Sequence, residues 1–303
     1  MAAMPRGVRN AAGVDSPRAA LATCAERPEL TRDDTLLARA LQRRGVATVP
    51  RPWDATVDWG GFSAVVLRST WDYHLRIDAF HSWLDRLDAS RVPVLNPTRI
   101  VRWNSHKGYL RDLRDRGVPI LPTLWLGRGE QRTLENVLDE TGWSEAVVKP
   151  AVSASAHDTW RTSRARADQD QAAFDAQLLA GDVLVQELAP EIASEGEWSL
   201  VFFGPVWSHA VLKRPAPGDF RVQEELGGTP QSLVPPPALV GQAERILAGL
   251  PAMPAYARVD GVARGGRLLL MELELIEPAL YLGTSAGAAD RFADAVLDTL
   301  RPM

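Results

Sequence analysis

Residues 267–282, RLLLMELELIEPALYL, combine a strand-like apolar run with three carboxylates, Glu272, Glu274 and Glu277. A glutamate is almost never fully buried without a partner, and an unpaired buried carboxylate tends to protonate. Side chains two residues apart share one face of a strand, so Glu272 and Glu274 project together. In the folded protein, the negative charges on this face must be compensated by positive charges or remain exposed to water.

The preceding segment, YARVDGVAR, is the expected partner strand of a hairpin. A two-residue loop of Gly265 and Gly266 would turn Asp260 away from Glu272. We predict instead a three-residue loop over 265–267, with one glycine at positive φ, which pairs Asp260 with Glu272. Three carboxylates in one volume need a cation, and oxygen ligands suit Mg²⁺. On these residues alone, a strand with a solvated glutamate face remains an alternative.

The composition is that of a globular protein and excludes several functions. The 303 residues are 46% hydrophobic and 24% charged, with a net charge of −4. That balance argues against a nucleic-acid or anionic-membrane binder. No apolar run is long enough for a membrane helix, and we see no signal peptide. The single cysteine, Cys24, rules out an intrachain disulfide and indicates a reducing compartment, so we expect the cytoplasm.

The chain uses lysine sparingly. Of its 34 Lys and Arg residues only three are lysines, Lys107, Lys149 and Lys213. Lysine is a compact point charge, whereas arginine is a planar fork. Either codon bias explains this pattern or these three positions need an ammonium group.

The order of strand and helix patterns divides the chain into four parts. Strand–helix alternation predicts a small parallel α/β domain, in which ligands bind beyond the carboxyl ends of the strands. The middle reads as α+β, with a helix over 102–116 and a small-residue loop over 151–157, and the rest is mostly β with a closing helix. The predicted parts are a loose tail (1–18), an N-terminal α/β substrate domain (19–101), a central lid subdomain (102–185) and a C-terminal subdomain with the metal hairpin (186–303).

Six short motifs, in this order and spacing, resemble the ATP-grasp superfamily, in particular its bacterial glutathione synthetase and D-Ala–D-Ala ligase branch. They are VVKP (147–150), VLVQELAP (183–190), GEWSLVFF (196–203), RVQEELGG (221–228), ARVD (257–260) and LMELE (270–274). RSTWDY (68–73) and GDFRVQEELGG (218–228) further resemble a subgroup of small ligases that includes the cyclo-ligase forming D-cycloserine from O-ureido-D-serine. The resemblance covers residues 19–300 and implies an ATP-grasp fold.

The resemblance assigns the nucleotide site. Lys107 and Lys149 correspond to the lysines that reach the α- and β-phosphates, and the loop 151–157 corresponds to the lid above them. Adenine is expected at Gln186 and the backbone of Glu187, Leu188 and Ala189. Glu197 matches the acidic residue that binds the ribose hydroxyls.

The resemblance also assigns catalytic and metal residues. Lys213 and Arg221 fall near the transferred phosphate, and Arg258 matches the arginine that stabilises the tetrahedral intermediate. Asp260, Glu272 and Glu274 match the ligands of Mg²⁺ (or Mn²⁺), although Glu274 stands where the family usually has Asn. For the substrate we expect Arg68 to bind its carboxylate and Asp72 its amine. The remaining candidate pocket residues are Gln223, Gly228 and Tyr281, with Glu277 beside them.

The implied activity is that of an ADP-forming ligase. ATP phosphorylates a small amino-acid-like carboxylate, and a nitrogen nucleophile then attacks the acyl phosphate. The specific hypothesis is intramolecular cyclisation of O-ureido-D-serine to D-cycloserine. An intermolecular amino-acid or dipeptide ligase is one alternative, and a nucleotide-binding regulatory module without ligase activity is another. We expect no nucleic-acid or membrane partner, and a homo-oligomer remains open.

Overall fold

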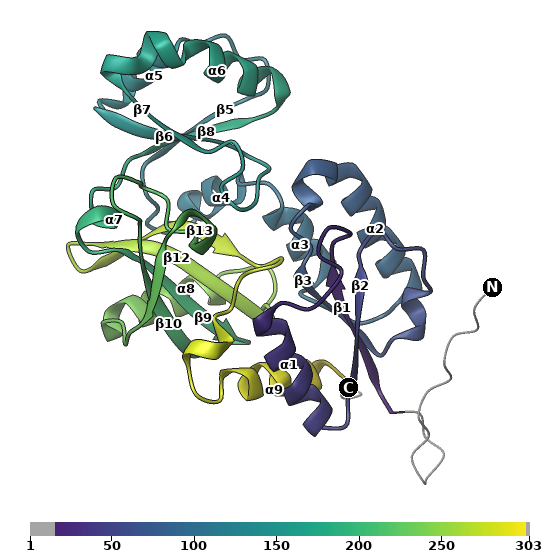
Figure 1. Ribbon diagram of the computed structural model, residues 1–303. Helices are drawn as coiled ribbons and strands as arrows, with labels where there is room; N and C mark the ends of the chain where they lie inside the picture. Colours follow the sequence, from purple (N-terminus) through teal and green to yellow (C-terminus); the bar gives the residue numbers. More distant parts are fainter. Residues whose placement is uncertain (1–15, 301–303) are drawn as a thin grey trace.

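The structure, a computed structural model, describes residues 16–300, so residues 1–15 of the predicted loose tail lie outside the described residues. Three sheets organise this part of the chain (Figure 1). One four-stranded sheet lies near the N-terminus, a second four-stranded sheet is central, and a five-stranded sheet comes from the C-terminal third. A parallel sheet followed by antiparallel ones is the predicted fold class, which is confirmed.

The N-terminal sheet is parallel, in the order β2-β1-β3-β4. Alternate side chains of β1 enter two different cores, because strand side chains alternate between faces. Ala19 and Leu21 pack with helix α1, and Ala20 and Ala22 pack with helix α2. The elements are β1 (Arg18–Thr23), α1 (Arg32–Arg43), β2 (Ala47–Pro52), β3 (Ala64–Ser69), α2 (Ile77–Ser90) and β4 (Val94–Leu95).

The helix predicted over 102–116 is wrong as a single element. The chain forms α3 (Thr98–Asn104) and α4 (Tyr109–Asp115), separated by a short break. In the break, the backbone N–H of Lys107 donates to the carbonyl of Ala151, 2.7 Å away, instead of to a helical carbonyl. This tertiary hydrogen bond ties the break to the loop after β6.

The central sheet is antiparallel, in the order β5-β8-β6-β7, and α5 and α6 cover one of its faces (Figure 1). The helices and strands share a small core that includes Leu138, Phe174 and Val185. The elements are β5 (Thr123–Leu126), α5 (Leu134–Thr141), β6 (Glu145–Pro150), β7 (Trp160–Ser163), α6 (Ala167–Ala180) and β8 (Val183–Glu187).

The C-terminal sheet is antiparallel, in the order β11-β10-β9-β12-β13. The last helix, α9, returns to the N-terminal domain and packs on α1 through Phe292 and Val296 (Figure 1). The elements are α7 (Glu191–Ser194), β9 (Glu197–Phe203), β10 (Val206–Arg214), β11 (Thr229–Ser232), α8 (Pro237–Ala248), β12 (Tyr256–Arg264), β13 (Arg267–Glu274) and α9 (Ala288–Leu300). None of the helices within residues 16–300 has the length and apolarity to cross a membrane.

Five short 3₁₀ turns complete the regular structure of the described residues. They are η1 (Trp59–Gly61), η2 (Tyr73–Arg76), η3 (Arg164–Arg166), η4 (Glu224–Leu226) and η5 (Leu282–Thr284).

The hairpin of β12 and β13 has the predicted register but not the predicted loop. Its loop has two residues, Gly265 and Gly266, both at positive φ. Asp260 nevertheless lies opposite Glu272, because a bulge shifts the register next to Asp260, leaving Met271 as the extra residue of β13. The prediction of a three-residue loop is therefore wrong, while the pairing it was meant to explain is confirmed.

Candidate active site

A cavity of about 690 Å³ opens where the three sheets meet, a volume typical of sites that enclose small ligands. Its walls come from the N-terminal domain (Trp71 and Tyr73), the loop after β6 (Ser153 to Ala156), β8, and the β12–β13 hairpin. The carboxyl end of β3 contributes the first of these walls, as expected for a parallel sheet.

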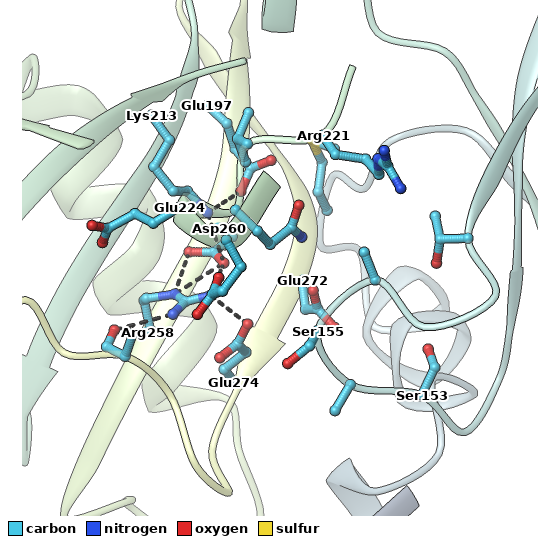
Figure 2. Close-up of a pocket in the computed structure, with 18 of the residues that line it drawn as sticks. Ser153, Ser155, Glu197, Lys213, Arg221, Glu224, Arg258, Asp260, Glu272 and Glu274 are labelled. Carbon is cyan, nitrogen blue, oxygen red and sulfur yellow. Dashed lines mark hydrogen bonds and ion pairs between the residues drawn. The ribbon is translucent and has the colours of Figure 1, made fainter. Parts of the chain in front are cut away.

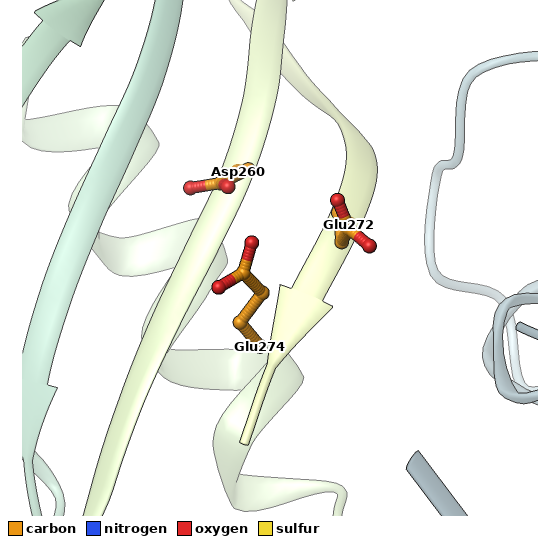
Figure 3. Close-up of side chains that lie close together, drawn as sticks. All are labelled: Asp260, Glu272 and Glu274. Carbon is orange, nitrogen blue, oxygen red and sulfur yellow. The ribbon is translucent and has the colours of Figure 1, made fainter. Parts of the chain in front are cut away.

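Three carboxylates, Asp260 of β12 and Glu272 and Glu274 of β13, project into this cavity from neighbouring strands (Figure 3). Ligand oxygens of all three lie within 4.8 Å of one another. Hard divalent cations such as Mg²⁺ take oxygen donors of this kind. The hairpin thus assembles the predicted ligand set, and its role in metal binding stays a prediction.

Asp260 is the most deeply buried of the three, with 2% of its surface exposed. It accepts hydrogen bonds from Ser199 Oγ at 2.6 Å and from Arg258 Nη2 at 2.8 Å, and Lys213 Nζ lies 3.5 Å away. Burial opposes ionisation, but Arg258 and then Lys213 lower the pKa of Asp260 to about 2. This carboxylate is therefore ionised at neutral pH before any metal binds.

Glu272 and Glu274 have opposite electrostatic surroundings. Glu272 forms an ion pair with Lys107 at 3.0 Å. Burial raises its pKa, but Lys107 and Lys149 outweigh that effect and lower it. Glu274 pairs with Arg258, yet burial raises its pKa to about 7, with the nearby carboxylates Glu272 and Asp260 adding to the rise. A bound cation would favour the ionised form of Glu274.

Lys213 of β10 bridges two carboxylates on neighbouring strands (Figure 2). Its Nζ lies 2.5 Å from Glu197 Oε1 and within reach of Asp260. Burial lowers the pKa of Lys213, but Asp260 and Glu197 together raise it above its ordinary value. The ribose-binding candidate Glu197 is thus engaged with a lysine in this structure.

Lys149 and Lys107 also face the cavity, from β6 and from the break between α3 and α4. Lys149 Nζ donates to Gln186 Oε1 at 3.0 Å, and burial lowers the pKa of Lys149 to about 8. Lys107 Nζ donates to the carbonyl of Ser153 at 2.8 Å in the predicted lid loop. All three lysines of the chain therefore line one cavity.

The expected adenine hinge lines the cavity, but the Gln186 side chain has other partners. Its oxygen accepts from Lys149, and its amide nitrogen donates to Thr123 Oγ1 at 2.9 Å. Glu187, Leu188 and Ala189 follow it along the cavity wall. The backbone of these residues stays a candidate for adenine, whereas Gln186 acts here as a support for Lys149.

Four further candidates occupy or border the cavity. Arg221 lines it, and Asp219 holds its guanidinium at 2.9 Å. Gln223 lines it with a buried side-chain oxygen that has no hydrogen-bond partner. Tyr281 lies with its ring centroid 5.8 Å from the guanidinium carbon of Arg258. Gly228 is outside the lining; a Cβ there would sit 2.0 Å from the carbonyl oxygen of Val222, so it is required for a close backbone approach.

The structure does not bring Arg68 and Asp72 to the cavity. Arg68 is buried and pairs with Asp34 at 2.7 Å, with both side chains about 97% covered or more. Asp72 accepts from Trp53 Nε1 at 2.7 Å and pairs with Arg76 at 2.5 Å. Arg68 lies in β3 and Asp72 follows it, as expected, but both charged groups are paired within the protein, although Arg68 Nη1 has no hydrogen-bond partner. Neither residue lines the cavity.

Two residues at or behind the cavity wall escaped the sequence reasoning. Asn104 lines the cavity and clamps β13, since its amide nitrogen donates to the carbonyl of Leu273 and its oxygen accepts from the N–H of Leu275. Ser199 holds Asp260. The signal for both was a small polar residue inside an otherwise apolar element, which is weak because such residues also occur on solvated faces.

Comparisons with known proteins agree on one family. Residues 19–96 match the family model described as the D-cycloserine synthetase DcsG N-terminal domain. The chain is 33% identical over 285 residues to the cycloserine biosynthesis protein DcsG of Streptomyces lavendulae. That alignment covers 88% of this chain and 93% of the relative.

Similar solved structures include the same synthetase and other ATP-grasp proteins. The crystal structure of D-cycloserine synthetase DcsG matches with a TM-score of 0.83 and 30% identity, covering 94% of this chain and all of that one. A RimK-domain ATP-grasp protein of Sphaerobacter thermophilus matches with a TM-score of 0.66 and 19% identity, covering 92% of this chain and 99% of that one. The D-alanine–D-alanine ligase of Bacillus anthracis complexed with ATP matches with a TM-score of 0.64 and 14% identity, covering 94% of this chain and 97% of that one. The last two similarities concern the fold alone.

Proposed function

Because this chain belongs to the ATP-grasp ligase family of D-cycloserine synthetase DcsG, we propose that it cyclises O-ureido-D-serine to D-cycloserine. The ATP-grasp fold and the class of ATP-dependent ligase, both expected from six sequence motifs, are confirmed by that membership. The identity of the substrate is what we propose. It is supported by the names of the relatives and by the motifs RSTWDY and GDFRVQEELGG.

One observation carries the proposal. A chain with only three lysines places all of them around one cavity, together with Arg258 and a group of three carboxylates. Phosphoryl transfer needs this combination, because cations must offset the charge of the transferring group while carboxylates hold a metal. A solvated strand face, the alternative left open by the sequence, would not place buried carboxylates opposite buried lysines.

The carboxylates fit a divalent cation. They offer only oxygen donors, lie within 4.8 Å of one another, and include Asp260, which is ionised. We infer that Asp260, Glu272 and Glu274 hold Mg²⁺ or Mn²⁺. When bound, the ion would supply neutralisation of the charge on the phosphate oxygens.

The remaining residues bind and orient the reactants. When ATP binds, Lys107 would leave Glu272 and the Ser153 carbonyl, and Lys149 would leave Gln186. Both ammonium groups would then bind phosphate oxygens of ATP. A phosphate beside Lys149 favours its ammonium form and reverses the effect of burial on its pKa. The backbone of Glu187, Leu188 and Ala189 would receive adenine.

The reaction then takes two displacements and a hydrolysis. An oxygen of the substrate carboxylate attacks the γ-phosphorus, and ADP leaves with the electrons of the broken P–O bond. The N–O nitrogen of the same substrate molecule attacks the acyl carbon, a proton leaves that nitrogen, and phosphate departs, which closes the ring. Water then hydrolyses the bond between that nitrogen and the carbamoyl carbon, and the carbamoyl group leaves as CO2 and ammonia, which gives D-cycloserine. Arg258 and Lys213, with Arg221 at the cavity wall, offset the negative charge that develops on the carboxyl and phosphoryl oxygens.

The proposal is tested by ADP release from purified protein given ATP, Mg²⁺ and a single amino acid. We expect O-ureido-D-serine alone to support turnover, with one ADP formed per D-cycloserine. Turnover that strictly requires two different amino acids would instead identify an intermolecular ligase. ATP binding without ADP release on any amino acid would identify a nucleotide-binding module.

We place this reaction in the cytoplasm. It consumes ATP, and the one cysteine of the chain, Cys24, is a buried free thiol at the end of β1. A free thiol fits a reducing compartment. The partner we infer is a small amino acid enclosed by the cavity.

A further inference from the structure

Glu277 is the cavity carboxyl to which the proposed mechanism gives no task. It follows β13, lines the cavity and is half-buried. Among residues 16–300 it forms no ion pair with a lysine, arginine or histidine. The other interior carboxylates of the cavity are all satisfied: Asp260 and Glu274 by Arg258, Glu272 by Lys107, Glu197 by Lys213, Glu187 by Arg264, and Asp33 by the N–H of Leu282.

The backbone around Glu277 is held in place by other parts of the protein. Four consecutive carbonyls accept hydrogen bonds from side chains of two distant segments, the end of β3 and β12. The pairs are Tyr256 Oη to Ile276 (2.8 Å), Trp71 Nε1 to Glu277 (3.4 Å), Arg68 Nη2 to Pro278 (2.9 Å) and Arg258 Nη1 to Ala279 (3.0 Å). A fixed backbone that presents a carboxyl group without an ion-pair partner to a cavity is the arrangement of a preorganised binding residue.

The surroundings of Glu277 favour a cation. Tyr73 lines the cavity near it, since burial and then Glu277 raise the pKa of Tyr73. Trp71 lines the cavity as well. Aromatic rings attract ammonium groups through their faces. A cationic ligand group here would find a carboxyl and aromatic side chains together.

The substrate carries a matching group. In an α-amino acid the ammonium nitrogen and the carboxyl carbon are bonded to the same carbon atom. A carboxylate placed for phosphorylation beside Arg258 and Glu274 therefore puts the ammonium only a short distance away. Glu277 lies three residues beyond Glu274 on the same segment, whereas Asp72, the acceptor expected from the sequence, is occupied by Arg76 and Trp53.

We propose that the Glu277 carboxylate binds the α-ammonium group of the substrate and selects amino acids over acids that lack the amine. This inference rests on the proposed function and adds to it the residue that recognises the amine. Neither the ATP-binding residues nor the metal ligands are involved in this selection.

The electrostatic surroundings of Glu277 agree with this role. Burial, and then the nearby Glu274, raise the pKa of Glu277 to about 8. An unpaired carboxyl with so high a pKa is unfavourable for stability alone and is typical of functional sites. An ammonium ligand favours the ionised form and so gains a charge-assisted hydrogen bond.

The test compares a substrate with its des-amino counterpart in wild type and Glu277→Gln. The probes are O-ureido-D-serine, measured as KM in ADP release, and 3-(ureidooxy)propanoate, measured as an inhibition constant. We expect Glu277→Gln to raise the KM of the amino acid roughly ten- to a hundredfold, the usual value of a charge-assisted hydrogen bond. The inhibition constant of the des-amino acid and the KM of ATP should stay within about twofold, because neither ligand offers an ammonium group.

Glu244→Gln is the matched control, since Glu244 is an exposed carboxylate of α8 that does not line the cavity. It should leave both constants unchanged. The Glu277→Gln protein should melt at the wild-type temperature, because glutamine replaces an uncharged carboxyl of the same size.

Two results would overturn the inference: equal rises of both constants in Glu277→Gln, which indicate a structural role, or no change in either. If the wild type turns over a different amino acid, the same comparison is made with that amino acid and its des-amino form. A wild type that releases no ADP with any amino acid overturns the proposed function and this inference together, and that failure is visible without any variant.

Discussion

Glu274 differs from its neighbours in the metal group in both its partner and its charge state. It pairs with Arg258, and burial raises its pKa to about 7, whereas Asp260 and Glu272 have lowered pKa values. The family resemblance places Asn at this position. A third carboxylate adds negative charge to the ligand set, which should tighten the binding of a divalent cation.

Replacing Glu274 with Asn tests this effect of charge. Glu274→Asn keeps an oxygen ligand but removes one negative charge, so we expect the Kd of Mn²⁺ to rise by about tenfold or more. Isothermal titration calorimetry without ATP measures it. Glu244→Gln, which removes an exposed carboxylate of α8, should leave the Kd unchanged. An unchanged Kd in Glu274→Asn would show that Glu274 is not a ligand.

At the scale of the element, the β12–β13 hairpin shows how one residue sets a register. Gly265 and Gly266 form a tight two-residue loop, and the bulge beside Gly261 then restores the pairing of Asp260 with Glu272. The side-chain alternation was readable from the sequence, but the position of the extra residue was not. An isolated glycine inside a strand, here Gly261, was the available signal for a bulge.

Gly261 should not tolerate a side chain. A Cβ there would lie 2.4 Å from the carbonyl oxygen of Leu269 on β13, so Gly261→Ala must push the two strands apart. We expect a loss of about 2 kcal/mol in the free energy of unfolding, measured by urea titration, together with weaker Mn²⁺ binding. The control is Gly127→Ala, where a Cβ meets open space and the change should stay within ~0.5 kcal/mol. Equal stabilities of the two variants would show that the bulge is not constrained here.

At the scale of the whole molecule, the cavity exists because the N- and C-terminal domains are joined around it. Arg68 of β3 is central to that junction, since it pairs with Asp34 of α1 and donates to the carbonyl of Pro278. Its guanidinium also lies 5.5 Å from the Phe292 ring of α9. The residue expected to bind substrate therefore positions the segment that carries Glu277.

Asp34→Asn should separate these two roles of Arg68. It leaves a buried arginine without its carboxylate, so we expect the free energy of unfolding to fall by roughly 3–5 kcal/mol. The KM of O-ureido-D-serine should change far less than in Glu277→Gln. Asp54→Asn, which breaks a partly exposed pair with Arg76, should cost no more than about 1 kcal/mol. A large rise in KM with unchanged stability in Asp34→Asn would restore Arg68 as a substrate ligand.

The sequence by itself determined the fold class and most of the elements, and it predicted the side chains of the phosphate and metal region. These follow from local rules: alternation places Glu272 and Glu274 on one face, and motif spacing identifies the strands that carry Lys149, Lys213 and Asp260. Only the tertiary structure decided which charges are free to bind ligands. Arg68 and Asp72 have the residue types that bind an amino acid, yet Arg68 is paired with Asp34 of α1, and Asp72 accepts from Trp53 as well as from nearby Arg76. Whether Arg68 is already neutralised depends on a contact between distant segments, and no local pattern records it.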